Sequence, residues 1–493
     1  MFVLAVGVRL SGTMRGAGLY GLGNYDDGVH FAAALGLVNG LLPYRDFLLL
    51  HPPGVVLALA PFAALSWLIG EPDAMAVARV SWMVLGGVNA VLCGLVLRPV
   101  SRLAGVVAAL FYALSIGAVY VEHTALLEPP ATTVLLLALV ITRLLGSGAG
   151  IRTGHYVAAG LLLGLSPVLK IWGVVAVLVV VITVLARRGR RPALWTLGSA
   201  LASCTAACLP FFLAAPQQMW QMVVVAQVGR RRADERLSAR LDDILGVREW
   251  TGGSGRWSTW LAVMLVLVLA ATVICLFRAE LRVLAALMIT HGALVLYTPM
   301  WFLHYAGLTA APMALTLGGA LAATTLWCRS AAFLPPPLTR WAPRVLAGVA
   351  VVGTLALAYP MRHVDLGNKE FPVEQLAAGA RGQSGCLTTD WPMTLIQLDL
   401  LQREIDQGCR FVVDLGGYSY YLIDSPYHLE SRRKNEDWQA LALEYYRSGD
   451  AMISVRFSTA SGFSKETART IESWPVIVRA DGYVIRRPEP GGR

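Results

Sequence analysis

The chain has 493 residues, of which 56% are hydrophobic and only 15% are charged, and its mean hydropathy is +0.59. Soluble domains carry roughly 25% charged residues, so this composition excludes a soluble globular protein and predicts a polytopic α-helical membrane protein. The formal net charge of +10 does not indicate a nucleic-acid-binding protein, because the basic residues lie mainly in short gaps between apolar runs.

The first seventy residues contain three apolar stretches of different length. Residues 1–10 are shorter than the ~20 residues that cross a bilayer, and we expect them to be the end of a first transmembrane helix rather than a signal peptide. Residues 28–38 predict a short helix that two aspartates open and Asn39-Gly40 closes. The stretch 53–70 is nearly long enough to span the membrane.

The distribution of arginine decides how 53–70 is placed. If this stretch lies along the outer surface as a juxtamembrane helix, ten spans follow the first partial one, which makes eleven. They are residues 76–97, 103–121, 128–145, 155–169, 171–187, 193–215, 257–277, 281–299, 306–328 and 344–360. The gaps on one side then hold thirteen arginines against the single acid Glu280, as the positive-inside rule requires. A full span at 53–70 would reverse every later loop.

The predicted organisation is a transmembrane catalytic domain over residues 1–360, with a first outer loop at 11–75, and a small extracytoplasmic α/β domain over 361–493. The C-terminal part lacks long apolar runs, and residues 409–414 and 483–485 resemble strands. Cys386 and Cys409 lie there and predict either a disulfide or two buried thiols. The seven cysteines show no metal-ligand spacing.

The polar segment Tyr25-Asp26-Asp27-Gly28-Val29-His30 holds the first candidate site residues. A helix N-terminus lowers the pKa of a carboxylate and keeps it ionised, as a general base requires. Asp26 and Asp27 are therefore candidates for a catalytic base, and the alternative is that they only cap the helix.

Further candidates collect on the predicted outer side. His51 precedes Pro52-Pro53-Gly54 at a helix start, where free N–H groups suit a phosphate. Glu128 begins a span, as a helix-start acid or a second active-site carboxylate. Lys170, the only lysine before the C-terminal domain, either snorkels to lipid headgroups or binds an anionic substrate. Arg230 belongs to a loop that either forms a solvated face or contacts a phosphate. The remaining candidates are Asp46, His123 and His304.

In this order the motifs resemble the GT-C superfamily of membrane glycosyltransferases, in particular its protein O-mannosyltransferase and aminoarabinose transferase-like branch. The resemblance rests on Tyr25-Asp26-Asp27-Gly28, Tyr44-Arg45-Asp46, His51-Pro52-Pro53-Gly54, Glu128 before a proline, and Lys170 after a Gly-Leu-rich run, and it covers about residues 20–190. The chain departs from the family pattern at Asp27 for Glu, Gly54 for Leu and Glu128 for Asp.

The resemblance implies a polyprenyl-phosphate sugar donor, transfer to an acceptor hydroxyl on the outer side of the membrane, and inversion at the anomeric carbon. Asp26 takes the place of the presumed base and Asp27 that of the glutamate; Glu128 matches the second acid and Lys170 the later lysine. No cofactor is firmly implied, and a divalent metal stays possible at Glu128. The partners would be the lipid-linked donor, a glycan, lipid or protein acceptor, and the plasma membrane, without nucleic acid.

The composition, rich in Ala, Arg and Gly, suits an actinobacterium, whose cell envelope uses lipid-linked sugars. A transporter or flippase of an envelope lipid intermediate is the alternative function. It would place polar residues at mid-membrane depth inside the spans, whereas the charges here are expected at one face.

Overall fold

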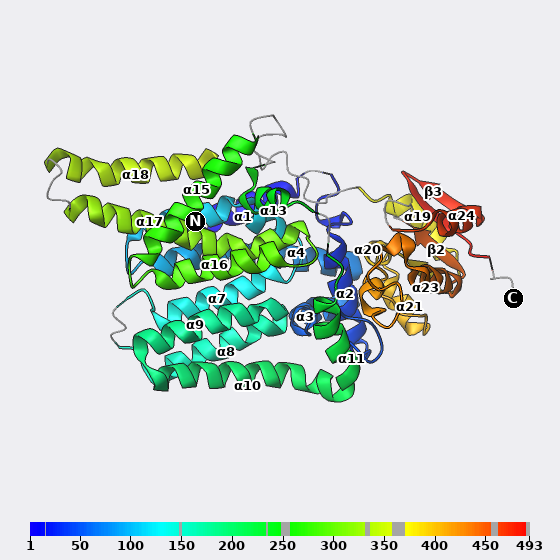
Figure 1. The fold of residues 1–493 in the computed structure, drawn as a ribbon. Coiled ribbons are helices and arrows are strands. Elements are labelled where there is room, and N and C mark those ends of the chain that lie inside the picture. The colour runs from blue at the N-terminus through cyan, green and yellow to red at the C-terminus, as the bar shows by residue number, and fades with distance from the viewer. Residues whose placement is uncertain are drawn as a thin grey trace. The chain divides into compact units, whose positions relative to one another are not determined.

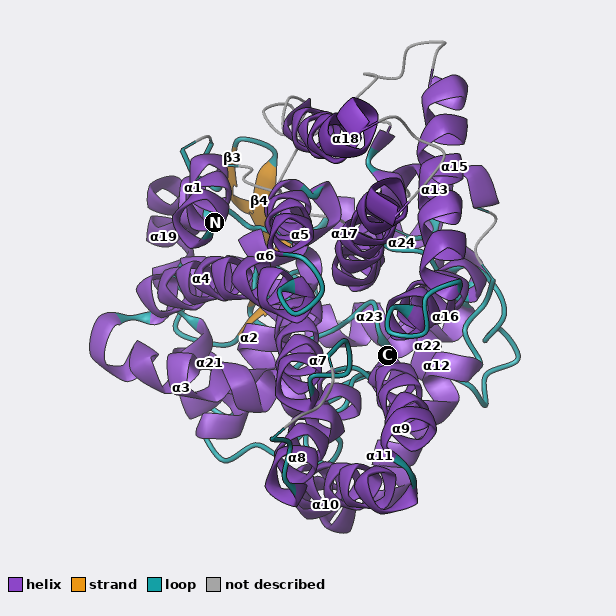
Figure 2. Ribbon diagram, turned by 90° about the vertical axis from the view of Figure 1, so that its left-hand side faces the viewer, coloured by secondary structure: helices purple, strands orange, loops and turns teal. Residues whose placement is uncertain are grey.

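A computed structural model of the protein describes residues 1–14, 16–146, 150–232, 235–247, 257–330, 336–356, 370–454 and 462–489. The contacts divide the chain into two compact units. The first unit contains residues 1–12, 80–207 and 234–365, and the second contains residues 13–79, 208–233 and 366–493. Helices dominate the described residues and strands are few (Figure 2). Each unit is described by itself.

The first unit is a bundle of apolar helices, called the helical unit below. Its helices are α1 (Phe2–Gly12), α4 (Glu71–Leu97, from Val80 on), α5 (Arg102–Leu114), α6 (Ile116–His123), α7 (Glu128–Thr142), α8 (Thr153–Leu169), α9 (Val174–Arg188), α10 (Arg190–Ala214, up to Ala207), α13 (Leu237–Leu245), α15 (Trp257–Leu276), α16 (Arg282–Tyr297), α17 (Gly307–Ser330) and α18 (Pro336–Ala356). The helices α7 and α8 pack together (Figure 1). The helix α17 packs against α5, α15 and α16.

Each predicted span overlaps one of these helices, except 103–121, which is divided between α5 and α6; residues 357–360 lie outside the described residues. Among the described helices, five are long and apolar enough to cross a membrane, and six if a bent pair counts as one span. That pair is α5 and α6, bent by 55° at Ser115. Several other apolar helices are shorter, with 10–17 residues. The number of eleven spans and their orientation stay predictions.

The second unit, called the loop unit below, combines the first predicted outer loop with the C-terminal residues. It contains α2 (Tyr25–Val38), α3 (Gly54–Ile69), α11 (Pro216–Trp220), α12 (Ala226–Val228), α19 (Val373–Arg381), α20 (Met393–Gln397), α21 (Leu401–Asp406), α22 (Tyr418–Tyr421), α23 (Glu436–Arg447) and α24 (Lys465–Ser473). Its four-stranded sheet has the order β1-β2-β4-β3, with β1 (Leu387–Thr389), β2 (Ala451–Ser454), β3 (Val476–Ala480) and β4 (Tyr483–Arg486).

The helix α2 packs closely against C-terminal residues of the same unit. A Cβ atom on Gly28 would lie 3.1 Å from the Met393 backbone nitrogen, and one on Gly36 would lie 2.7 Å from the Phe411 ring. The contact at Gly36 is shorter than real Cβ atoms show, and the contact at Gly28 is tighter than nine in ten of them, so a side chain at either position would require its neighbour to move. The acidic turn and the C-terminal residues therefore belong to one packed body.

Two carboxylates cap each other's helices in the loop unit. Glu71, the first residue of α4, accepts hydrogen bonds from the backbone N–H groups of Leu401 (3.2 Å) and Gln402 (2.7 Å), where α21 begins. Asp399 in turn accepts one from the Glu71 N–H (2.9 Å). N-terminal N–H groups have no partner inside their own helix, so each carboxylate stabilises the first turn of the other helix.

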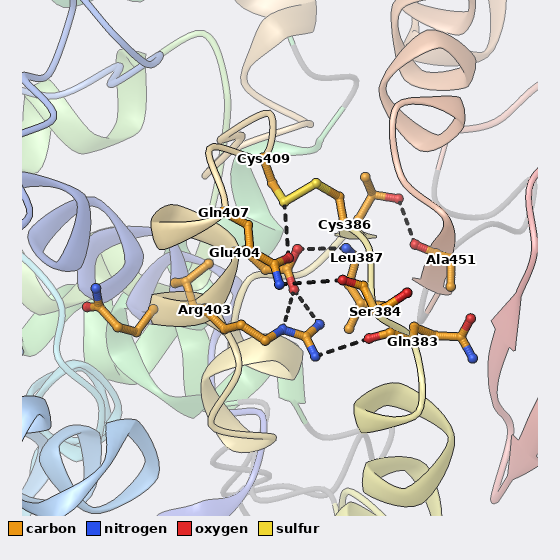
Figure 3. Close-up of polar contacts among 12 residues, drawn as sticks. Gln383, Ser384, Cys386, Leu387, Arg403, Glu404, Gln407, Cys409 and Ala451 are labelled. Atoms are coloured by element: carbon orange, nitrogen blue, oxygen red, sulfur yellow. Dashed lines mark hydrogen bonds and ion pairs between the residues drawn. A yellow bond between two sulfur atoms is a disulfide. The ribbon is translucent and has the colours of Figure 1, made fainter.

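Cys386 and Cys409 form a disulfide, one of the two arrangements the sequence allowed (Figure 3). Cys386 directly precedes β1, whereas residues 409–414, predicted to be a strand, form none. Phe411 instead packs against Gly36 and against the Phe47 ring, 5.3 Å between centroids, so this apolar run covers α2 and does not join the sheet. The predicted strand at 483–485 is confirmed as β4.

Candidate active site

The acidic turn is the first turn of α2, which begins at Tyr25, earlier than predicted. Asn24 is the N-cap, and its side-chain oxygen accepts a hydrogen bond from the Asp26 N–H at 2.9 Å. The interpretation of Asp26 and Asp27 as the cap is therefore wrong: both belong to the first turn of the helix itself, close to the positive end of the helix dipole. Asp26 is half-buried, whereas Asp27 is fully buried.

Asp27 forms a buried ion pair with Arg79 of α4, a partner that the sequence did not reveal. Arg79 Nη2 lies 2.9 Å from Asp27 Oδ2, and Nη1 donates to the carbonyl oxygens of Leu19 (2.5 Å) and Gly21 (2.8 Å). Burial raises the pKa of Asp27 from 3.8 to about 6, although Arg79 lowers it. Arg79 thus links Asp27 to the segment that precedes α2, through the carbonyl groups of Leu19 and Gly21.

The other first-loop candidates lie at different places. The ring of His51 meets that of His30, a residue of α2, edge to face at 5.7 Å between centroids. Asp46 pairs with Arg45 at 2.8 Å and accepts the Leu42 N–H at 2.7 Å, which fixes its own turn. His51 therefore contacts α2, the helix that begins with the acidic turn. Asp46 stabilises its own loop and contacts neither residue of the acidic pair in these interactions.

In the helical unit, the structure brings Glu128, Lys170 and His304 together. Lys170 Nζ lies 2.5 Å from Glu128 Oε1, and His304 Nε2 lies 3.9 Å from the same oxygen. All three side chains are buried, so Lys170 does not snorkel to a surface. Its ammonium group also lies 4.4 Å from the Tyr305 ring centroid and 4.8 Å from that of Trp172, distances at which cation–π attraction contributes.

Lys170 borders a small cavity of about 20 Å³ inside the helical unit. Most of its lining is apolar, and its polar members are Lys170, His291, Ser166 and Thr132. His291 was missed in the sequence because a single histidine in an apolar run has no local signal. Its Nδ1 lies 2.9 Å from the Leu287 carbonyl oxygen, one helical turn earlier.

His123 is buried at the end of α6, beside a second charged pair that the sequence also missed. Glu122 accepts hydrogen bonds from Arg9 Nε (2.7 Å), from the Tyr112 hydroxyl (2.6 Å) and from Asn89 (3.1 Å). The carboxylate is thus paired with a cation and hydrogen-bonded, as a charge in an apolar interior requires.

Arg230 lies in the loop unit, 4.6 Å from the centroid of the Tyr420 ring. It is near Asp414, whose Oδ1 accepts a hydrogen bond from the Tyr25 hydroxyl at 3.0 Å. Arg230 is therefore placed beside the first residue of α2. Asp26, Asp27, His51 and Arg230 belong to the loop unit, and Glu128, Lys170, His123 and His304 to the helical unit.

Among the described residues, one group of His, Cys, Asp or Glu has the spacing of a metal site: Cys386, Glu404 and Cys409. The two sulfur atoms are bonded to each other, and Glu404 accepts hydrogen bonds from the Leu387 N–H and from Arg403 (Figure 3). These side chains already satisfy one another, so this group does not fit a metal ion.

Solved structures with the same fold are membrane glycosyltransferases. The chain superposes on the aminoarabinose transferase ArnT from Cupriavidus metallidurans bound to undecaprenyl phosphate, with a TM-score of 0.60 and 14% identity over 99% of this chain and 98% of that one. It also superposes on the archaeal oligosaccharyltransferase AglB from Archaeoglobus fulgidus in complex with an inhibitory peptide and a dolichol-phosphate, with a TM-score of 0.56 and 12% identity over 96% and 71%.

A third likeness is to the Archaeoglobus fulgidus oligosaccharyltransferase in complex with Zn and sulfate, at a TM-score of 0.54 and 12% identity over 95% and 70% of the two chains. Comparisons with protein-family models and with curated protein sequences find no match. The fold is thus that of the GT-C glycosyltransferases, which confirms the resemblance seen in the sequence at the level of the fold. ArnT represents the aminoarabinose transferase branch.

Proposed function

We propose that the chain is a cell-envelope glycosyltransferase that moves a sugar from a polyprenyl-phosphate donor to an acceptor hydroxyl on the outer side of the membrane. The observation that supports it most is the acidic turn at the start of α2, in a chain with the fold of ArnT and AglB. Those two proteins were solved with undecaprenyl phosphate and dolichol-phosphate, which supports a lipid-phosphate donor here. The protein would be a multi-pass plasma membrane protein with residues 361–493 outside.

Asp26 is assigned as the general base. The acceptor oxygen attacks the anomeric carbon, its proton passes to the Asp26 carboxylate, and the bond from the anomeric carbon to the phosphate oxygen breaks with inversion. A phosphate is already a good leaving group, so no acid is needed. Asp26 is half-buried and close to the N-terminus of α2, which favours the ionised carboxylate.

Asp27 and Glu128, the other two acids predicted to be catalytic, are assigned supporting roles. Asp27 is fully buried and bound by Arg79, so it positions the turn that carries Asp26. Glu128 holds Lys170, and one of its oxygens, Oε2, is buried without a hydrogen-bond partner among the described residues. That oxygen is available to a substrate hydroxyl or to a metal ion, and the ammonium group of Lys170 beside it disfavours the metal ion.

The donor phosphate is assigned to His51, Lys170 and Arg230. The three N–H bonds of a lysine ammonium allow Lys170 to keep Glu128 and still donate to a phosphate oxygen. Trp172 and Tyr305 beside Lys170 keep the group fixed.

Transfer from a radiolabelled lipid-linked sugar to endogenous acceptors tests the proposal. Membranes that contain the wild-type chain should incorporate label, and membranes with Asp26→Asn should not, at equal protein levels. Mass spectrometry of envelope glycans and glycoproteins from a deletion strain would then identify the sugar and the acceptor. Incorporation by Asp26→Asn at the wild-type rate would refute the assignment of the base.

A transporter or flippase of an envelope lipid intermediate is a second candidate, which the buried pair of Arg9 and Glu122 supports. Both side chains are completely buried among helices of the helical unit, as polar groups on a transport path would be. Proteoliposomes separate the two functions. A transporter moves the labelled lipid across the bilayer with its sugar attached, whereas the glycosyltransferase releases the lipid phosphate only when an acceptor is present.

A further inference from the structure

Two hydroxyl side chains lie one helical turn away from the pair of Glu128 and Lys170 in the helical unit. Thr132 follows Glu128 by four residues on α7, and Ser166 precedes Lys170 by four residues at the end of α8. Residues four apart lie on the same face of a helix, so both hydroxyls face the seam that the ion pair closes. Both residues line the small cavity that Lys170 borders.

These two hydroxyls differ from most others inside the helices of this unit. A serine or threonine in a helix can bond to a carbonyl oxygen one turn earlier, as Thr133 does with Pro129 (3.0 Å). Thr132 and Ser166 are both buried, and neither hydroxyl makes a hydrogen bond to any residue that the structure describes. A buried hydroxyl without a partner costs free energy, so this pair calls for a further hydrogen-bonding group.

His291 of α16 brings an acceptor to the same cavity. Its Nδ1 lies 2.9 Å from the Leu287 carbonyl oxygen, and a carbonyl can only accept, so Nδ1 carries the proton of the neutral ring. The other nitrogen, Nε2, is then a hydrogen-bond acceptor, and no described residue donates to it. The ring is buried and lines the cavity. Three polar side chains from α7, α8 and α16 thus surround one space and do not bond to one another.

The size of the cavity limits what can bind there. Its volume of about 20 Å³ has room for a water molecule and none for a sugar ring. A buried water needs roughly two to four polar partners, which this lining offers. A further acceptor lies on α17, where Pro312 has no N–H and leaves the Leu308 carbonyl without its usual donor four residues later. Both of these residues also line the cavity.

We propose that the cavity is the binding site of one water molecule, which His291, Ser166 and Thr132 hold beside Lys170. The water donates a hydrogen bond to His291 Nε2 and accepts one from a hydroxyl or from the Lys170 ammonium group. Of the three N–H bonds of Lys170, one binds Glu128, so the others can reach the water and a further ligand. The water thereby links α16 to the charged pair of α7 and α8. The site does not depend on the proposed function.

Cryo-electron microscopy of the purified full-length protein in nanodiscs, at a resolution that shows ordered water, tests the site. The wild type should show one density peak within hydrogen-bonding distance of His291 Nε2 and of at least one of the two hydroxyls. His291→Leu removes the acceptor at similar side-chain size, so the peak should disappear. Thr290→Val is the matched control and should keep the peak, because Thr290 bonds to the Ala286 carbonyl (2.7 Å) and does not line the cavity. A wild type without the peak, or His291→Leu with the peak unchanged, would overturn the site.

Thermal unfolding in detergent tests whether the residues share the water. Ser166→Ala and His291→Leu should each lower the melting temperature by several degrees, because each leaves the remaining polar groups with fewer partners. The double variant should lose clearly less than the sum, since both changes act on the same water. Ser166→Ala with Thr290→Val should give additive losses. Additive losses in the first pair, or equal non-additivity in the second, would overturn the shared site. If His291→Leu does not fold, Thr132→Val takes its place with the same criteria.

Discussion

Lys170 Nζ lies 2.5 Å from Glu128 Oε1, and both side chains are buried within the helical unit. The two residues are 42 positions apart, at the end of α8 and at the start of α7, so the pair joins the ends of two helices that pack side by side. Removing one partner of a buried ion pair strongly destabilises the protein, because the other partner stays buried as an uncompensated charge.

Lys170→Met should therefore lower the stability of the protein strongly, on the order of 3–5 kcal/mol, because Glu128 would stay buried without its cation. The double variant Glu128→Gln with Lys170→Met should recover most of the loss. Thermal unfolding in detergent, followed by circular dichroism, compares the two. Equal melting temperatures of the single and double variants would show that the pair is not coupled.

Asp26→Asn should abolish sugar transfer and leave the melting temperature within a few degrees of the wild type, because Asp26 is half-buried and its backbone is capped by Asn24. Asp406→Asn is the matched control. Asp406 is exposed, its carboxylate contacts only Gln402 (2.9 Å) among the described residues, and its loss should not alter transfer. If both variants lose activity alike, a general effect of charge explains the loss better than a base does.

Asp27 should make the folded protein less stable as the pH rises, which is the opposite of the usual effect of a carboxylate in an ion pair. Its folded-state pKa of about 6 lies above the ordinary 3.8, so the folded protein binds more protons than the unfolded chain between these values. Its contribution to stability is therefore complete below about pH 4 and falls as the pH rises through 6, by on the order of 3 kcal/mol. The melting temperature of the wild type relative to Asp27→Asn should thus be higher at pH 4.5 than at pH 7.5. A constant difference would mean that Asp27 titrates normally.

The disulfide should stabilise the loop unit by about 3 kcal/mol, the value expected for a closed loop of this length, here 23 residues. Cys386→Ser with Cys409→Ser should accordingly melt several degrees lower. In protein alkylated without a reductant, the mass should show these two cysteines unmodified, while Cys328, which is outside the disulfide, serves as the reference thiol. Alkylation of Cys386 and Cys409 in the native protein would contradict the pairing.

The sequence was sufficient for those features that arise from local patterns. Apolar runs located the helices of the helical unit, and Asn39-Gly40 marked the end of α2, where Gly40 has a φ of +88°. The cap residue Asn24 was also readable, since asparagine is a favoured N-cap, but the two aspartates after it drew the prediction one turn too far.

Contacts between distant residues could not be predicted. Arg9 and Glu122 are 113 positions apart, and Tyr25 and Asp414 are 389 apart. Nothing in the local pattern around Arg79 distinguishes a partner of Asp27 from an ordinary interfacial arginine. The same limit explains the wrong strand at 409–414, because alternating apolar residues fit a helix surface as well as a sheet, and only the position of α2 decides.

The mutual capping of α4 and α21 has a consequence for how the protein is made. Glu71 leaves the ribosome 330 residues before Leu401, so the first turn of α21 meets its carboxylate only near the end of translation. During insertion of the intervening helices, the loop that carries the acidic turn therefore lacks the contacts between Glu71 and residues 399–402. A stop codon shortly before residue 399 would leave an inserted protein in which the loop with the acidic turn never acquires its final shape.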